Sequence, residues 1–181
     1  MMRLFTAVEV APEIGEGLVR RQQGLPGARW RPPDTLHITL RFFGATAENM
    51  ARDLDGELAS IPAAPFDLDL EGVGSFGEGQ DVHAVWAGVG ESEPLRRLAK
   101  RCETAARRAG LKPELRNYHP HVTLAYLRHA DPARIGAWLQ GHNLLKSPPF
   151  RVTWFGLYSS WPTSEGSRYE LEREYPLAGG S

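Results

Sequence analysis

A four-residue pattern, His-x-Thr followed by an apolar residue, occurs twice in the chain, as His37-Ile38-Thr39-Leu40 and as His121-Val122-Thr123-Leu124. Side chains alternate between the two faces of a β-strand, so each copy places its His and its Thr on one face and two apolar residues on the other. The pattern therefore predicts two half-buried strands. The copies lie about half a chain length apart, which indicates two similar lobes.

The rest of the sequence predicts short strands mixed with helices. Alternating or β-rich runs predict strands at 3–10, 36–43, 66–70, 82–89, 121–127, 150–159 and 169–175. Apolar spacing and breakers predict helices at 12–23, 46–60 (with Thr46 as the N-cap), 91–110 and 132–139, and the glycines at 72–79 predict a loop. Strands that follow one another through short loops favour the α+β class with antiparallel sheets, here as one domain over residues 1–181.

Composition limits what the chain can do. A net charge of −1 argues against a protein that binds long nucleic acids by backbone charge, but a short RNA end or a nucleotide needs only a local positive pocket. The one cysteine, Cys102, excludes an internal disulfide and lies on the apolar stripe of the predicted 91–110 helix, which indicates a core position. With no leader-like segment and no apolar run long enough to span a bilayer, we expect a cytoplasmic protein without a membrane partner.

Two histidines on separate strands suit proton transfer on both sides of a reacting atom. Hydrolysis at a phosphate requires water to lose a proton and the departing oxygen to gain one, so one imidazole must be neutral and the other protonated. Hydroxyls such as those of Thr39 and Thr123 can donate to phosphate oxygens as their charge grows. His119 and His121 lack the spacing of a zinc site, so we expect no metal and no cofactor.

These motifs resemble a known family. Residues 29–44, with Arg29-Trp30, Pro33 and Leu36-His37-Ile38-Thr39-Leu40-Arg41-Phe42-Phe43-Gly44, resemble the first signature of the two-histidine (2H) phosphoesterases. Arg116 and Pro120-His121-Val122-Thr123-Leu124-Ala125 resemble the second signature. The most similar branch is the RNA 2′,3′-cyclic phosphodiesterases, also called 2′-5′ RNA ligases (LigT-like), and the similarity covers nearly the whole chain.

The resemblance implies a two-lobed fold with a pseudo-twofold axis and a central cleft that holds both motifs. It also implies metal-independent hydrolysis of a ribose 2′,3′-cyclic phosphate, on an RNA end or a nucleotide, to a 2′-phosphomonoester by a monomeric enzyme. In the family, the first histidine donates a proton to the 3′ oxygen and the second activates water. Motif matching assigns these roles to His37 and His121, and phosphate contacts to Thr39 and Thr123.

The chain departs from the family at one position. The branch commonly has an arginine five residues after the second motif histidine, where it helps to hold the phosphate, and here that residue is Tyr126. Either the Tyr126 hydroxyl replaces it, or Arg128 or Arg116 supplies the charge, or phosphate binding is weaker. Tyr118, close to the second motif, is a candidate for stacking on a base.

Three other functions remain open at this point. The first is 2′-5′ RNA ligation, the reverse reaction, in which a 5′-hydroxyl replaces water. The second is a module that binds a nucleotide or RNA in the same cleft without catalysis. The third is a metal-dependent hydrolase, which complete activity in a chelator would exclude.

Overall fold

The two motif strands belong to two different antiparallel sheets. The computed structural model describes residues 1–164 and 166–178. The first sheet has the order β10-β9-β1-β3, with β1 (Met2–Glu9), β3 (His37–Thr46), β9 (Trp154–Thr163) and β10 (Gly166–Pro176). The second has the order β2-β7-β6-β5, with β2 (Arg29–Trp30), β5 (Leu70–Phe76), β6 (Ala84–Val89) and β7 (His121–Tyr126). Each sheet thus holds one His-x-Thr copy.

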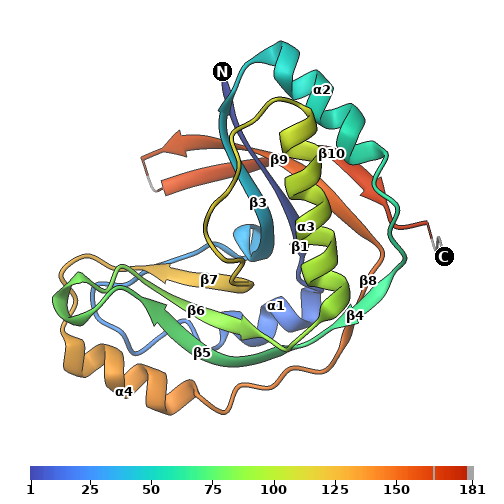
Figure 1. Cartoon of the computed structure of the whole chain (residues 1–181). Coiled ribbons are helices and arrows are strands. Elements are labelled where there is room, and N and C mark those ends of the chain that lie inside the picture. The colour runs from blue at the N-terminus through green and yellow to red at the C-terminus, as the bar shows by residue number, and fades with distance from the viewer. Residues whose placement is uncertain (165, 179–181) are drawn as a thin grey trace.

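The two motif strands come together although they belong to different sheets. β3 contacts β7, and Figure 1 shows the two strands near the centre of the molecule. A two-stranded sheet, β4 (Phe66–Leu68) with β8 (Phe150–Val152), lies where the chain passes between the larger sheets. The predicted α+β class with antiparallel sheets is confirmed.

The helices lie outside the strands that carry the motifs. They are α1 (Pro12–Val19), α2 (Glu48–Ala59), α3 (Glu93–Arg108) and α4 (Pro132–His142), with single 3-10 turns at Pro33–Thr35 and Gly79–Asp81. α3 packs on β3 and α2, and α4 packs on β5. In the part of the chain that the structure describes, no helix is long and apolar enough to cross a bilayer.

The buried face of α3 joins the helix layer to the first sheet. Leu95, Leu98 and Ala106 belong to the same core cluster as Ile38 of β3. Cys102 is also buried there, and burial raises the pKa of its thiol to about 12. The prediction that Cys102 is a core residue is confirmed.

The prediction of Thr46 as a helix N-cap is wrong. Thr46 is the last residue of β3, because Met2 of β1 still pairs with it, and its hydroxyl donates to the carbonyl of Gly44 at 2.9 Å. The helix begins at Glu48, and the N-cap position is Ala47, which makes no side-chain cap bond.

The prediction of a loop through the glycines at 72–79 is only partly right. β5 continues to Phe76 and includes Gly72 and Gly74. A Cβ at Gly74 would overlap the ring of Trp86 on the neighbouring strand β6. Glycine is therefore needed here for the close approach of a large ring, not for a turn.

Candidate active site

The alternation predicted for the two motifs is present in both strands. His37 and Thr39 of β3 are half-buried, whereas Ile38 and Leu40 between and after them are buried. β7 repeats this pattern from its first residue to its fourth. Each strand thus presents an imidazole and a hydroxyl on one face and contributes aliphatic side chains to the core on the other.

The internal similarity extends beyond the four-residue pattern. In β3 the register against β1 shifts around Leu40, and in β7 the register against β6 shifts around Leu124, the same position of the motif. Each bulge reverses the alternation, so that the fifth residue after each histidine is exposed. These residues are both aromatic, Phe42 (56% exposed) and Tyr126 (42% exposed).

His37 lies among aromatic rings of the first sheet. Its imidazole stacks on Phe5 with 5.1 Å between ring centroids, and the edge-on ring of Tyr169 is 5.2 Å away. Burial lowers the pKa of His37 to about 4; the charges of Arg31 and His121 add to this effect, and a hydrogen bond to the carbonyl of Thr35 opposes it. His37 is therefore neutral at pH 7 when no ligand is bound.

His121 is held by a backbone contact. Its Nδ1 lies 2.7 Å from the carbonyl oxygen of His119. A carbonyl only accepts, so Nδ1 carries the proton and the lone pair of neutral His121 is on Nε2. The edge-on ring of Phe76 is 4.8 Å from the imidazole. Burial lowers the pKa of His121, the charge of His119 lowers it further, and the hydrogen bond to the His119 carbonyl opposes both.

The two histidines are near each other and are held in the same way. A charge on His121 lowers the pKa of His37, and the strands β3 and β7 that carry them contact each other, so the two imidazoles lie near each other. Each imidazole hydrogen-bonds to the carbonyl two residues before it, that of Thr35 for His37 and that of His119 for His121. Backbone carbonyls thus orient these two rings.

Tyr118 supports the first motif from the segment that leads into the second. Its hydroxyl donates to the carbonyl of Thr39 at 2.8 Å, and burial raises its pKa. The segment itself is irregular but anchored, because the buried Arg41 donates to Glu103 at 2.6 Å and to the carbonyl of Lys112 at 2.7 Å. The sequence did not indicate the hydrogen bond from Tyr118 to the Thr39 carbonyl. Base stacking by Tyr118 stays a prediction.

The candidates for positive charge lie in different surroundings. Arg116 is 82% exposed and forms an ion pair with Glu114 at 3.0 Å. Arg128 is exposed beyond the end of β7. Arg31, which the sequence did not indicate, places its guanidinium carbon 5.4 Å from the ring centroid of Tyr126. Because β2 has only two residues, its pairing with β7 gives no readable sequence signal, although this pairing brings Arg31 to the site.

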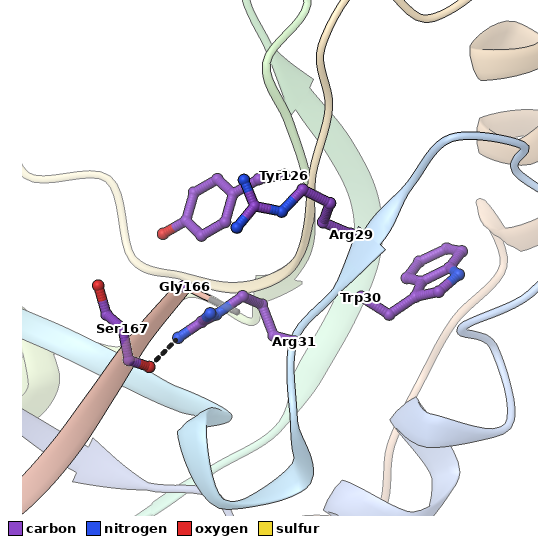
Figure 2. A pocket seen from close by; sticks show the side chains of 6 residues that line it. All are labelled: Arg29, Trp30, Arg31, Tyr126, Gly166 and Ser167. Atoms are coloured by element: carbon purple, nitrogen blue, oxygen red, sulfur yellow. Dashed lines mark hydrogen bonds between the residues drawn. The ribbon is translucent and has the colours of Figure 1, made fainter. Parts of the chain in front are cut away.

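A small pocket lies beside these residues. It has a volume of about 190 Å³ and is lined by Arg29, Trp30, Arg31, Tyr126, Gly166 and Ser167. Figure 2 shows the two guanidinium groups on the side of Tyr126, and the Trp30 ring directed away. The pocket therefore carries positive charge from the end of β2. Among the described residues, no group of three or more His, Cys, Asp and Glu side chains is arranged to hold a metal ion.

The arrangement brings together two groups that can transfer protons. Two imidazoles from different sheets lie near each other, and each shares its strand face with a threonine. Hydroxyls can stabilise negative charge on oxygen, and a nearby cationic pocket attracts an anion. This set suits in-line displacement at phosphorus.

Comparison with known proteins gives a consistent family. Residues 11–160 match the model of the 2′-5′ RNA ligase superfamily. The RNA 2′,3′-cyclic phosphodiesterase of Archaeoglobus fulgidus is 31% identical over 134 residues, which cover 72% of this chain and 76% of that protein. The Escherichia coli protein of the same name is 30% identical over 184 residues, covering 97% and 96%.

Solved structures agree in fold. The crystal structure of E. coli LigT complexed with 3′-AMP superposes with a TM-score of 0.80 and 28% identity, covering 97% of this chain and 98% of that one. The crystal structure of TT0787 from Thermus thermophilus has a TM-score of 0.81 and 26% identity, covering 98% and 99%.

Proposed function

The chain belongs to the 2′-5′ RNA ligase superfamily, and on this basis we propose that it is an RNA 2′,3′-cyclic phosphodiesterase. It hydrolyses the 2′,3′-cyclic phosphate at the end of an RNA or on a nucleotide and leaves a 2′-phosphomonoester. The relatives with this name support the reaction, and one observation supports its mechanism: the two His-x-Thr strands come from different sheets, contact each other and carry imidazoles close enough for one charge to affect the other. The proposed site takes residues from both sheets, which supports the proposal that residues 1–181 form one two-lobed domain.

His121 is the general base. Its Nδ1 proton is engaged by the His119 carbonyl, so the Nε2 lone pair is the group that accepts a proton from the attacking water. As the new P–O bond forms, the bond from phosphorus to the ribose 3′ oxygen breaks. His37 gives its proton to that oxygen, and Thr39 and Thr123 donate to the non-bridging oxygens, which carry the growing negative charge.

This mechanism requires His37 to gain a proton before it acts. Its pKa of about 4 in the free protein results from burial and from the charges of Arg31 and His121. A cyclic phosphate carries one negative charge, and an anion close to an imidazole favours its charged form. Binding of the substrate therefore raises the pKa of His37, so the substrate brings the general acid into its active form.

The test is hydrolysis of 2′,3′-cyclic AMP in excess chelator, followed by phosphorus NMR. The intact protein is compared with His37→Ala and His121→Ala, and Arg134→Gln, an exposed position on α4, serves as the control for handling. We expect 2′-AMP as the product and a loss of at least about a hundredfold in rate for each histidine variant.

Each alternative outcome has a clear meaning. Formation of 3′-AMP would reverse the assignments of acid and base. Binding of the nucleotide without turnover, also for short RNAs that end in a cyclic phosphate, would favour a binding module. Activity that disappears in chelator and returns with a divalent metal would favour the metal-dependent hydrolase.

A further inference from the structure

The chain has two buried arginines with opposite surroundings. Arg41 is 9% exposed and is neutralised by Glu103, whose carboxylate lies 2.6 Å from its Nε. Arg31 is 6% exposed, and among the residues that the structure describes no carboxylate forms an ion pair with it. A buried charge without a counter-ion is costly, and none of the described residues supplies one to Arg31, so the contrast favours an anionic ligand.

The partners of Arg31 in the described structure are neutral. Its Nη2 donates to the carbonyl of Ser167 at 3.4 Å, as Figure 2 shows, and it hydrogen-bonds to Tyr169. Its guanidinium carbon lies 5.4 Å from the ring centroid of Tyr126 and 5.5 Å from that of Tyr169. A guanidinium has five N–H donors in a planar fork, so donors remain for an anion.

The backbone around Arg31 fixes its place. Its amide donates to the carbonyl of Leu124 at 2.8 Å, which ties the residue to β7 beside the second motif. Gly166 lies against the guanidinium at a φ of 125°, and a Cβ there would be 3.3 Å from Nη1. The side chain is thus held between β7 and the start of β10, in the wall of the 190 Å³ pocket.

This position is next to the reacting groups. Tyr169 contacts both sides, because its ring is 5.2 Å from the His37 imidazole and 5.5 Å from the Arg31 guanidinium carbon. The charge of Arg31 also reaches His37, whose pKa it lowers. An anion between Arg31 and His37 would neutralise the first and favour the protonated form of the second.

We infer that Arg31 binds the cyclic phosphate of the substrate and supplies the positive charge that Tyr126 lacks. Tyr126 and Tyr169 act as positioning residues, since their rings hold the guanidinium between them. This inference rests on the proposed function for the identity of the anion. The buried guanidinium near His37, which forms no ion pair with any residue that the structure describes, is an observation of its own.

The experiment uses Arg31→Gln and Arg31→Lys, with Arg134→Gln as the control for the loss of one positive charge. Hydrolysis of 2′,3′-cyclic AMP gives kcat/KM, and titration with inorganic phosphate, followed by calorimetry, gives anion affinity without turnover. We expect Arg31→Gln to lower both by about 10–100-fold, the range of a charged hydrogen-bonded contact. Arg31→Lys keeps the charge but loses the fork, so we expect an intermediate loss.

A structural role would give a different result. We therefore also follow the His37 imidazole by proton NMR, where Arg31→Gln should raise the pKa of His37 in the free protein and weaken its response to phosphate. If the variant is too unstable, Arg31→Met, which preserves much of the side-chain volume, is measured instead. Phosphate affinity and kcat/KM that equal those of the intact protein would overturn the inference.

The source of the anion and the proposed function are tested separately. A dinucleotide that ends in a cyclic phosphate carries a second, internal phosphate. A loss confined to this substrate would place Arg31 on the internal phosphate and contradict the assignment to the cyclic one. If the intact protein hydrolyses neither substrate, the proposed function fails, whereas the phosphate titration still decides whether Arg31 binds an anion.

Discussion

Nδ1 of His121 lies 2.7 Å from the carbonyl oxygen of His119, and this contact leaves Nε2 as the only basic atom of the ring. His37 is held by the corresponding carbonyl, that of Thr35. The two imidazoles therefore have equivalent backbone supports, although the proposed mechanism gives them different roles. The surroundings of the two rings must therefore make the difference, and one such difference is the charge of Arg31, which lowers the pKa of His37.

The first prediction concerns the pH dependence of kcat/KM, which reports groups of the free enzyme. In the proposed mechanism, activity needs neutral His121, whose pKa burial lowers from its ordinary value, and protonated His37, whose pKa is about 4. We expect a maximum on the acid side of pH 6.5 and a fall of about tenfold per unit above it. Initial rates at low 2′,3′-cyclic AMP from pH 4 to 8.5 measure this.

The profile of kcat should differ from that of kcat/KM. In the complex, the substrate anion raises the pKa of His37, so we expect the alkaline limb of kcat at higher pH. A kcat/KM that stays level from pH 6.5 to 8.5 would show that the free protein does not hold His37 as a neutral group.

A second prediction follows for stability. Because the pKa of His37 is lowered to about 4 in the folded state and is about 6.5 in the unfolded state, the unfolded chain binds more protons between these values. The free energy of unfolding should therefore fall as the pH is lowered from 6.5 to 4, by about 2–3 kcal/mol from His37 alone. Urea unfolding at pH 7.5 and pH 4.5 measures the change.

The control for this prediction is His37→Gln, which keeps a polar side chain but does not titrate. All other titrating groups contribute equally to both proteins, so the difference between their pH dependences isolates His37. Equal losses of stability in the intact protein and in His37→Gln would contradict the lowered pKa.

The alternation of apolar residues was enough to predict the motif strands and their faces. The strict period of two places Ile38 and Val122 in the core whatever the neighbouring strands are, and both are fully buried. The exposed Phe42 and Tyr126 could not be placed from that period, because a bulge at Leu40 and at Leu124 reverses it. A bulge depends on the partner strand, which the local sequence does not contain.

The place of Arg31 at the site could not be predicted from the sequence for a related reason. Its position depends on the pairing of the two-residue strand β2 with β7 and on a contact with Ser167 of β10, and both partners are far from Arg31 in the sequence. A basic residue in a polar connection is ordinarily solvated. Only the packed structure shows that Tyr126 and Tyr169 enclose this one.

A third prediction concerns the two motif threonines. Thr39→Val and Thr123→Val keep the β-branched shape and remove the hydroxyl, so the strands should be preserved. If the hydroxyls donate to oxygens whose charge grows in the transition state, each change should lower kcat by about a hundredfold with a smaller effect on KM. Steady-state kinetics with 2′,3′-cyclic AMP decide this, and an unchanged kcat would remove that threonine from the mechanism.

A fourth prediction separates two roles of Tyr118. Its hydroxyl supports the Thr39 carbonyl, so Tyr118→Phe should cost about 1 kcal/mol of unfolding free energy. If the ring also stacks on the base, Tyr118→Phe should keep KM and Tyr118→Leu should raise it. Urea unfolding and KM for 2′,3′-cyclic AMP are measured for both variants, and equal KM values would contradict base stacking.

The last prediction concerns Gly74, where a Cβ would overlap the Trp86 ring. That ring is 4.8 Å from His119 and 6.1 Å from His121 between centroids, so a displaced Trp86 should disturb the proposed general base. We expect Gly74→Ala to lower the unfolding free energy by about 1–3 kcal/mol, the usual cost of overpacking, and to lower kcat.

The matched control is Gly136→Ala on α4, where a Cβ meets nothing within 4 Å and should stabilise the helix by about 0.5–1 kcal/mol. The double variant Gly74→Ala with Trp86→Leu removes the overlap. Its loss of unfolding free energy should therefore be smaller than the sum of the losses in the two single variants. Urea unfolding of the intact protein, the two single variants and the double variant measures the coupling. Additive effects would mean that the glycine serves the backbone and not the ring, because only a shared contact makes the two changes depend on each other.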